Sequence, residues 1–574
     1  MATLGFAQEG SRVYIARCIQ CHDPNAEVHA PTPEALSVIP WQNIVKALET
    51  GPMAAVGAQM PASDRDAVAR YLGKVEINRA PVAMTGECAA KVKPKAGAAW
   101  NGWGVDDQNT RFQPTKAAGL TAEQLPSLKV KWAFGFPDTT TAYGQPTVAG
   151  GKVYTGSNDG TVFAIDQQTG CLYWRFQARS IVRDAVVIDG GRAYFGDLDS
   201  NFYALDANTG KLIWQKKLDS QPYTRITGTA KLYQGRLYVP ITSQEENAGA
   251  NPLYSCCTFR GRLIALNASD GSEIWSAYTV PEPKPTSKNS KGIQFYGPSG
   301  ATIWSSPTID PKRKLIYVAT GNGFSAPDVK TADALVAIDM QTGALKWSQQ
   351  TAPDMFNWGC GRGGVPDTNC PPNAGTDVDM GGSPILLEVS NGHQLIVGGQ
   401  KAAVVHAFDP DQQGKIVWST RIGRGGPGGG VQWGIAASPL TAGQAAIVFA
   451  PNGDAPGRGG APTPPVGGLY AIDAATGKLL WNNTTVTVKA PPTVIAGAVI
   501  SPGLDGHIRA YETSSGKLIW DFDGAKDFPT TNGIPAKGGA VVATGATIAD
   551  GMLFVNSGGA GMAGNVLLAF SVQK

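Results

Sequence analysis

The chain has 574 residues, of which 42% are hydrophobic and 16% charged, and its formal net charge is +3. A charge so close to balance gives no reason to expect nucleic acid or a membrane surface as a partner. No apolar run approaches the roughly 20 residues that a membrane-spanning helix needs. The 72 glycines and 40 prolines are typical of a turn-rich, mainly β protein.

Residues 1–75 are predicted to form a first, all-α domain. They contain Cys18, Cys21 and His22 in the C-x-x-C-H order that marks the covalent attachment of c-type haem. The two thiols add to the vinyl groups of the haem, and the histidine gives an axial nitrogen to the iron. A zinc site would need two further Cys or His ligands nearby, and only His29 is close in sequence. The motif therefore predicts haem c.

The second axial ligand of such a haem is expected to be Met or His, and the two candidates are Met53 and Met60. A short amphipathic helix follows them, and this arrangement resembles class I cytochrome c domains, in which the Met ligand lies on the loop before the last helix. We predict Met53 as the ligand. Met60 is the alternative, but it lies only three residues before the predicted helix cap and so has little loop with which to reach across the haem.

Residues 76–99, rich in Ala, Lys and Pro, are predicted to be a linker. A repeated unit, Asp-x-x-x-Gly-x-x-x-Trp, then dominates residues 100–574, and its clearest copy runs from Asp206 to Trp214. Glycine allows the turn, and tryptophan can bury a large area between neighbouring repeats. The other copies end at Trp174, Trp275, Trp347, Trp418, Trp481 and Trp520.

The two ends of this repeat array complement each other. Trp132 ends a strand-like run that lacks the preceding turn, whereas three strand-like runs after Trp520, at 541–548, 552–556 and 566–572, lack a closing Trp strand. A ring whose last blade takes one strand from near Trp132 resolves both deficits. We therefore predict a closed propeller of eight four-stranded blades rather than an open solenoid.

The segment WNGWG…NTRFQP, which begins at Trp100, and the Trp-docking repeats resemble the quinoprotein alcohol dehydrogenases over about residues 100–574. The N-terminal cytochrome makes the chain most similar to the cytochrome-containing polyvinyl alcohol dehydrogenases. The resemblance implies an enzyme that oxidises an alcohol to a carbonyl with pyrroloquinoline quinone (PQQ) and Ca²⁺ on the propeller axis. It also implies electron transfer to the fused haem and on to an external acceptor, such as a cytochrome or a copper protein.

The resemblance places several residues around the quinone. Trp304 resembles the tryptophan that stacks beneath the cofactor, Thr302 a neighbouring hydroxyl ligand, and Lys401 the basic residue that reaches the quinone oxygens. Trp433 resembles a further cofactor contact. By their charge and planar geometry, Arg183 and Arg260 are candidates for binding the PQQ carboxylates.

The resemblance also implies a metal site and a catalytic base. Asn322 and Glu245 match the metal ligands of the family, with Glu246 as the rival of Glu245 because the flanking glycines of the family are absent. The spacing to a following Pro selects Asp377 as the base and Asp379 as the alternative, although Thr376 stands where the family has Trp. Oxygen ligands suit Ca²⁺. A second aspartate two residues on is also seen in lanthanide-using relatives, so both metals stay open.

The cysteines indicate an oxidising compartment. Cys256 and Cys257 are adjacent, and in quinoprotein dehydrogenases a vicinal disulfide covers one face of the quinone; here the pair falls in a different blade, so its role as a lid is open. The other four could pair as Cys360 with Cys370 and Cys88 with Cys171. Haem attachment and disulfides both occur outside the bacterial cytoplasm. We therefore expect a periplasmic protein whose signal peptide has been removed, because MATLGFAQEG is too short to be one.

Two other functions remain open at this point. The chain could be a PQQ dehydrogenase for a different alcohol or for an aldose. Alternatively, it could be a cofactor-free propeller scaffold that binds proteins, as bacterial outer-membrane assembly factors with similar Trp-docking repeats do. Such a scaffold has no need of a haem motif or of Glu245, Asn322, Asp377 and Lys401 together.

Overall fold

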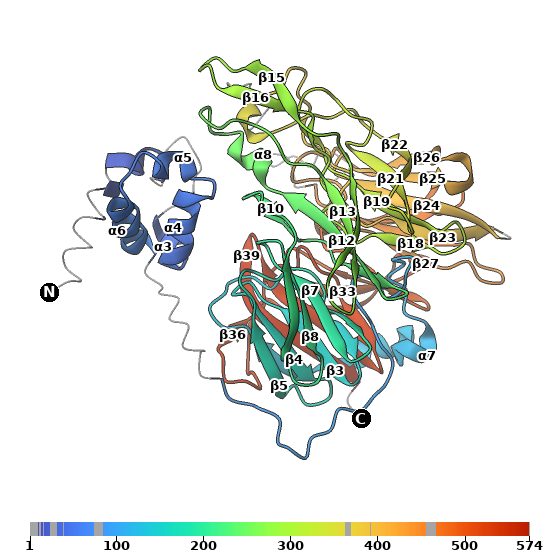
Figure 1. The fold of residues 1–574 in the computed structure, drawn as a ribbon. Coiled ribbons are helices and arrows are strands. Elements are labelled where there is room, and N and C mark those ends of the chain that lie inside the picture. Colours follow the sequence, from blue (N-terminus) through green and yellow to red (C-terminus); the bar gives the residue numbers. More distant parts are fainter. Residues whose placement is uncertain are drawn as a thin grey trace.

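A computed structural model describes residues 10, 13–14, 16–22, 31, 33–37, 39–73, 84–361, 369–390, 392–454 and 467–572 of the protein. A large ring of sheets follows a small helical part at the N-terminus (Figure 1). Residues 76–83 of the predicted linker lie outside the described residues, as do residues 1–9 and 74–75.

Within the described residues, eight antiparallel sheets of four or five strands succeed one another along the chain and form the blades of a propeller. Blades 1 and 2 consist of β2 (Thr147–Ala149), β3 (Lys152–Gly156), β4 (Thr161–Asp166) and β5 (Leu172–Gln177), then β6 (Val187–Asp189), β7 (Arg192–Gly196), β8 (Asn201–Asp206) and β9 (Leu212–Lys217). Blades 3 and 4 consist of β10 (Thr224–Arg225), β11 (Lys231–Tyr233), β12 (Arg236–Ser243), β13 (Arg262–Asn267) and β14 (Glu273–Tyr278), then β18 (Thr308–Asp310), β19 (Leu315–Ala319), β21 (Ala334–Asp339) and β22 (Leu345–Gln350).

The second half of the ring repeats the same meander. Blades 5 and 6 consist of β23 (Ile385–Ser390), β24 (His393–Gln400), β25 (Val404–Asp409) and β26 (Lys415–Arg421), then β27 (Ala436–Ser438), β28 (Ile447–Asn452), β29 (Gly468–Asp473) and β30 (Leu479–Asn483). Blades 7 and 8 consist of β31 (Thr493–Ile495), β32 (Ala498–Pro502), β33 (His507–Glu512) and β34 (Leu518–Asp523), then β37 (Thr547–Ala549), β38 (Met552–Gly559), β39 (Met562–Val572) and β1 (Leu128–Gly135).

Blade 8 closes the ring in the predicted way. Its outer strand β1 pairs antiparallel with β39, and Trp132 lies opposite Ala569. The predicted eight-bladed propeller, with three strands from the C-terminus and one from around Trp132, is therefore confirmed. The bounds of the three strands differ from the predicted ones: the second and third are longer, at Met552–Gly559 and Met562–Val572, and the first covers only Thr547–Ala549. The residues before this first strand leave the sheet and include Ala543 and Thr544, which line the axial cavity described below.

The tryptophans of the repeat hold neighbouring blades together. The indole N–H of Trp132 donates to the carbonyl of Gln167 in the turn of blade 1, at 3.1 Å, and that of Trp174 donates to Ala207 of blade 2, at 3.0 Å. A Cβ added to Gly170 would lie 2.7 Å from the Trp132 ring, and Gly170 has a φ of +74°, so the turn excludes side chains both by conformation and by space. These tryptophans are structural, as the sequence predicts.

One segment before blade 1 crosses the ring and pins several blades. The guanidinium of Arg111 is fully buried and donates to the carbonyls of Pro492 and Trp103, each at 2.7 Å. The Asn109 amide donates to the carbonyl of Pro307 at 2.9 Å. Blades 4 and 7 are thereby tied to the WNGWG segment, which brings Trp103 onto the axis.

Shorter elements decorate the ring and form the helical part. The helices are α2 (Ile19–His22), α3 (Pro33–Ser37), α4 (Trp41–Glu49), α5 (Ala54–Gly57), α6 (Ala62–Leu72), α7 (Thr115–Ala118) and α8 (Glu245–Ala248), with 3-10 turns η1 (Ala122–Ser127), η2 (Trp358–Cys360) and η3 (Pro410–Gln412). Three small ribbons pair β15 (Lys284–Lys288) with β16 (Gln294–Gly297), β17 (Ser299–Gly300) with β20 (Gly323–Ser325), and β35 (Asp527–Phe528) with β36 (Ala536–Lys537). None of the described helices is long and apolar enough to cross a membrane.

The helical part has its own apolar core, which includes Cys18, Ile44, Met60 and Val68. Lys46 on α4 forms an ion pair with Asp199 in the β7–β8 turn of blade 2. The Cys88–Cys171 disulfide fastens the middle of the predicted linker to blade 1, and Cys360–Cys370 closes the loop after η2, so both expected pairs are present.

Candidate active site

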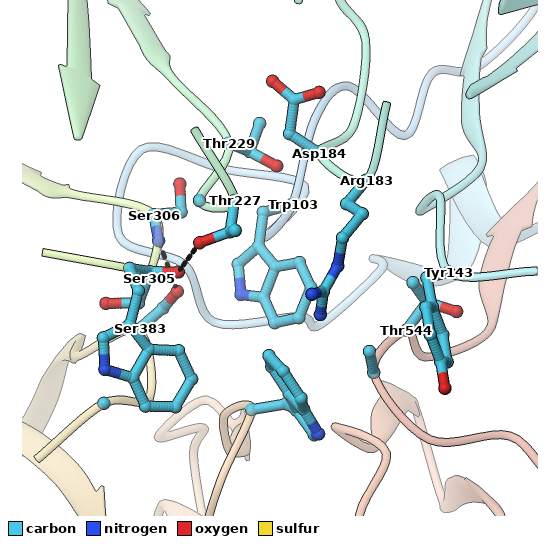
Figure 2. A pocket seen from close by; sticks show the side chains of 15 residues that line it. Trp103, Tyr143, Arg183, Asp184, Thr227, Thr229, Ser305, Ser306, Ser383 and Thr544 are labelled. Carbon is cyan, nitrogen blue, oxygen red and sulfur yellow. Dashed lines mark hydrogen bonds between the residues drawn. The ribbon is translucent and has the colours of Figure 1, made fainter. Parts of the chain in front are cut away.

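A cavity lies on the propeller axis and receives residues from most blades (Figure 2). Tyr143 comes from the start of blade 1, Arg183 from blade 2, Trp304 from blade 4 and Trp433 from blade 6, while Trp103 comes from the crossing segment. These residues lie in the loops that lead into the innermost strand of each blade. The repeat therefore brings residues as far apart in the chain as Trp103 and Thr544 into one cavity.

Two tryptophans that do not belong to the repeat meet in this cavity. The rings of Trp304 and Trp433 lie edge to face, with centroids 5.4 Å apart and an interplanar angle of 81°. The backbone of Gly381 packs on Trp304, and a Cβ added there would lie 1.5 Å from the indole. The Nε1 atom of Trp433 is buried and has no hydrogen-bond partner among the described residues. An aromatic wall with an unpaired donor is well suited to a flat ligand that carries acceptors.

Beside Trp304 lies a cluster of ionised side chains. The Nζ atom of Lys401 is 2.8 Å from Oδ1 of Asp377 and 2.7 Å from Oδ2 of Asp379. It also lies 5.7 Å from the centroid of the Trp304 ring. The backbone N–H of Asn322 donates to Oδ1 of Asp379 at 2.8 Å. The structure thus brings together five of the residues singled out in the sequence, from the loops of blades 4 and 5.

The amide of Asn322 is held in a defined orientation. Its Nδ2 donates to the carbonyls of Gly323, at 3.0 Å, and Phe356, at 2.7 Å. This leaves its side-chain oxygen as the group that can bind a cation. Thr302 is close by, because a Cβ on Gly321 would meet both Oγ1 of Thr302 and Oδ1 of Asp379 at 2.8 Å.

The electrostatics of the cluster show an excess of negative charge. Burial, and next the charge of Asp379, raise the pKa of Asp377 to about 7, against the opposing effect of Lys401. Burial, with Asp379 and Asp377, raises the pKa of Glu246 to about 8. Burial alone would lower the pKa of Lys401, but the two aspartates outweigh it and raise the pKa well above its usual value. Three carboxylates therefore share one ammonium.

Glu245, which the sequence favoured as a metal ligand, lies outside this cluster. Its carboxylate is fully buried and accepts from the Tyr254 hydroxyl at 2.8 Å and from the backbone N–H groups of Thr258, at 2.8 Å, and Phe259, at 2.7 Å. Its oxygens are occupied by these bonds, which anchor the segment after α8. Its rival, Glu246, is the residue whose charge interacts with Asp377 and Asp379.

The adjacent cysteines form the predicted disulfide. Cys256 and Cys257 are bonded to each other and fully buried. The amide of Asn357 points to Sγ of Cys256 at 4.0 Å, and the backbone of Tyr296 donates to the carbonyl of Cys256 at 2.9 Å. The disulfide directly precedes Thr258, whose N–H binds Glu245, so it belongs to the buried wall of blade 3.

The two arginines differ. Arg183 lines the cavity with its guanidinium 5.2 Å from the ring centroid of Tyr143 and 5.3 Å from that of Trp433. Arg260 instead lies 3.7 Å over the ring of Tyr278 and donates through Nε to the carbonyl of Val280 at 3.0 Å. Tyr278 is 40% exposed, so Arg260 faces the outside of blade 3. The charge argument is thus consistent with the position of Arg183 and not with that of Arg260.

Two buried aspartates near the cluster carry no signal in the sequence. Both carboxylate oxygens of Asp333 lack a hydrogen-bond partner in the described part of the chain, and so does Oδ1 of Asp354. Burial, followed by the charge of Asp379, raises the pKa of Asp333 well above its usual value. Asp354 accepts from the N–H of Val378 at 2.7 Å and so fixes the loop between the two aspartates of the cluster. Both lie in irregular segments without a recognisable motif.

The donor set of the cluster fits a hard divalent or trivalent cation. Glu246, Asp377, Asp379 and the oxygen of Asn322 are the hard ligands that such ions prefer, and the excess of carboxylate over ammonium is charge that a cation would neutralise. Within the described ranges, no three acidic, His or Cys side chains are arranged to hold a metal ion, and Lys401 pairs with both aspartates.

The C-x-x-C-H motif lies in the helical core. Cys18 is buried, Cys21 is exposed, and both are free thiols. His22 is 7% exposed, and its Nδ1 lies 2.7 Å from the carbonyl of Pro31, so Nε2 is the nitrogen that can face a metal. Met60 is 5% exposed in the same core, whereas Met53 is only partly buried at its edge. Burial thus favours Met60, the alternative, over Met53 as the second ligand of a haem held by the motif.

The comparisons with known proteins agree with this geometry. The family model described as outer membrane protein assembly factor BamB matches residues 119–333 and 400–568, which are blades of the propeller. A polyvinylalcohol dehydrogenase of Pseudomonas sp. is 37% identical over 98% of this chain and 94% of its own length. One from Sphingopyxis sp. is 36% identical over 98% of this chain and 93% of its length. The chain belongs to the polyvinyl alcohol dehydrogenase family, within the PQQ-dependent alcohol dehydrogenases.

The fold of this family member also resembles a solved quinohaemoprotein alcohol dehydrogenase, from Comamonas testosteroni. That structure superposes with a TM-score of 0.61 at 20% identity, covering 83% of this chain and 80% of the other. Membership of a dehydrogenase family overturns the scaffold hypothesis. The repeats are common to dehydrogenases and assembly factors, but the likeness to polyvinyl alcohol dehydrogenases extends over nearly the whole chain.

Proposed function

We propose that this dehydrogenase oxidises secondary alcohols, including the hydroxyl groups of poly(vinyl alcohol), to carbonyls at the axial site. The observation that carries the proposal is the contact of Lys401 with both Asp377 and Asp379 directly beside Trp304. This contact brings together three groups: a carboxylate that can accept a proton, the ammonium of Lys401, and a flat aromatic wall. The substrate class is supported by the names of the relatives at 37% and 36% identity.

PQQ, when bound, supplies the two-electron oxidation. Trp304 would stack on it, with Cys256–Cys257 on the blade 3 side, and Thr302 and Trp433 would hydrogen-bond its edge. Arg183 would bind a carboxylate of the cofactor, and Arg260 has no part in this site. Glu246, Asn322, Asp377 and Asp379 would hold Ca²⁺ or a lanthanide, and Glu245 shapes the wall behind them.

The protein groups around the substrate have separate roles. Asp377 accepts the hydroxyl proton, and its raised pKa brings it close to the pH at which a general base is most effective. Lys401 holds Asp377 in place and can donate a hydrogen bond to an oxygen that gains negative charge. Asp379, held by the N–H of Asn322, keeps Lys401 from rotating away. Trp304 and Trp433 exclude water from the aromatic side of the site.

The helical part is proposed to be a class I cytochrome c domain spanning residues 1–75. Cys18 and Cys21 would bind haem covalently, His22 would ligate the iron through Nε2, and Met60 is the better-buried candidate for the second ligand, with Met53 as the other. Such a haem would take electrons from the propeller, residues 100–574, and pass them to an external cytochrome or copper protein. The haem-attachment motif and three disulfides support a periplasmic location.

The experiment is reconstitution of the purified protein. Added PQQ and Ca²⁺ should make dye reduction depend on a secondary alcohol, and the same alcohol should reduce the haem absorbance band. A panel of secondary alcohols, primary alcohols and aldoses then ranks the substrates by kcat/KM. Dye reduction that is indifferent to PQQ would refute the proposal, and a higher kcat/KM for an aldose than for any secondary alcohol would correct the substrate class.

A further inference from the structure

A groove of about 390 Å³ separates the helical part from blade 3 of the propeller. In Figure 1, α5 lies on the side of the helical part that faces α8 and β10. The volume of the groove lies within the range of roughly 300–1,000 Å³ that is usual for binding sites of small ligands. The groove is lined by Gly51, Pro52, Ala54, Ala55, Ala58 and Gln59 on one side, and by Tyr223, Ala248, Asn251, Leu253, Tyr254 and Ser255 on the other.

The chemistry of the two walls is uniform. Within the part of the chain that the structure describes, every residue lining this groove is uncharged. The wall from α5 consists mainly of small side chains. The opposite wall is aromatic, with Tyr223 and Tyr254 edge to face at 5.6 Å and 84°, and with Leu253, which is 52% exposed. A charged ligand or an acidic protein would find no counter-charge here, whereas an uncharged chain loses little by entering.

The groove also has polar groups in fixed positions. The Tyr254 hydroxyl is held by Glu245 at 2.8 Å, so its ring cannot swing out of the wall. Asn251 accepts from the N–H of Leu253 through Oδ1, at 3.0 Å, which leaves its amide nitrogen to meet a hydroxyl group. Apolar surface with a few fixed polar groups suits a ligand that alternates methylene and hydroxyl groups.

Helix α8 links the groove to the candidate active site. Ala248 lines the groove, and Glu246, on the same four-residue helix, interacts with Asp377 and Asp379. A chain lying in the groove would therefore pass the element that forms one side of the catalytic cluster. Small alcohols have no need of such a surface, whereas a polymer must place many units outside the catalytic pocket.

We propose that this groove is a binding site for a stretch of an uncharged chain of secondary alcohols, which it holds beside the catalytic cluster. The proposal rests on the proposed function for its choice of ligand. Binding in the groove adds contacts that are the same before and during the reaction, so it lowers KM for the polymer without changing chemistry at Asp377. It distinguishes polymeric from small substrates.

The test uses the full-length protein loaded with PQQ, Ca²⁺ and haem, with poly(vinyl alcohol) and isopropanol as substrates. Ala55→Trp places a large ring in the groove from the α5 side, and Leu253→Ala removes contact area from the other wall. Leu480→Ala is the matched control, because Leu480 is 44% exposed on blade 6, away from the groove. We expect Ala55→Trp to raise KM for the polymer about tenfold, which corresponds to a loss of about 1.4 kcal/mol of binding free energy. The kcat/KM for isopropanol should stay within about twofold of the wild-type value.

Calorimetric binding of the polymer to the loaded Asp377→Asn protein gives a second readout without turnover. Ala55→Trp added to this variant should weaken binding by the same factor. An equal loss of kcat/KM for the polymer and for isopropanol, or no loss for either, would overturn the proposal that the groove binds the polymer. If no alcohol is oxidised but the polymer still binds in a manner sensitive to Ala55→Trp, the proposed function fails and the groove stands.

Discussion

The ammonium of Lys401 lies 2.8 Å from Oδ1 of Asp377, and the same ammonium lies 2.7 Å from Oδ2 of Asp379. One cation thus bridges two carboxylates that are two residues apart on a loop. Of these two aspartates, Asp377 is the one with a positive φ, +60°, a conformation that aspartate tolerates better than most residues. The loop turns at Asp377 and presents both side chains to Lys401.

We predict that Asp377→Asn lowers kcat by about 10²–10⁴, the usual contribution of a general base. The amide keeps the shape of the carboxylate but cannot accept the proton. Saturation with Ca²⁺ should restore PQQ binding, followed by absorbance, but not turnover. Asp379→Asn should be the milder change. Loss of turnover in Asp379→Asn together with an active Asp377→Asn would show that Asp379 is the base.

Glu246→Gln and Glu245→Gln should separate metal binding from stability. Glu246→Gln removes a charge from the cluster and should weaken Ca²⁺ binding, measured by calcium titration of PQQ-dependent activity. Glu245→Gln replaces an acceptor of several buried hydrogen bonds with a group that is partly a donor, at a cost of about 1–3 kcal/mol. Its effect should appear as a lower Tm with near-normal calcium affinity. The reverse pattern would restore Glu245 as the metal ligand.

The haem prediction concerns two cysteines and two methionines. Cys18→Ala with Cys21→Ala should abolish haem that survives denaturation as a covalent adduct, detected by the reduced α-band. Met60→Ala should remove a methionine-type axial signal, because Met60 is buried in the same core as Cys18. Met53→Ala should leave the signal intact. If Met53→Ala alone removes it, then the ligand is the residue that the sequence favoured.

His406 should make stability depend on pH. It is 7% exposed and contacts Ser419 Oγ at 2.8 Å and Gln400 Oε1 at 3.2 Å. Burial, and next the charge of Arg421, lower its pKa from 6.5 to about 4. Between these two values the unfolded state binds a proton that the folded state does not, so this residue makes stability fall as pH falls, by up to about 1.4 kcal/mol per pH unit.

His406→Gln disturbs the contacts of the imidazole with Ser419 and Gln400, so it should be less stable than the wild type at pH 7.5. The difference should shrink as the pH is lowered through the window, because only the wild type loses this stability there. Denaturant unfolding of both proteins at several pH values measures this difference, and effects of other groups cancel in the comparison. A difference that stays constant down to pH 4.5 would mean that His406 is not held neutral.

The sequence predicts much of the architecture because the repeat is local and its ends complement each other. The Trp of one unit packs on the Gly of the next unit along the chain, so spacing alone indicates the contact, as for Trp132 with Gly170. The closure of the ring by Trp132 follows from counting strands. The pairing of Cys88 with Cys171 was open in the sequence as one of several, and the structure shows it.

Only the tertiary structure decides which of several neighbouring residues enters the site. Glu245 and Glu246 are adjacent on α8, and successive residues on a helix point about 100° apart, so one binds the wall of blade 3 and the other faces the cluster. Arg260 is drawn outward by Tyr278, and Arg183 is held inward between Tyr143 and Trp433. The sequence determined which chemical groups this protein carries and how its ring closes. Their directions depend on packing between segments far apart in the chain, because only that packing determines which side of a loop is buried.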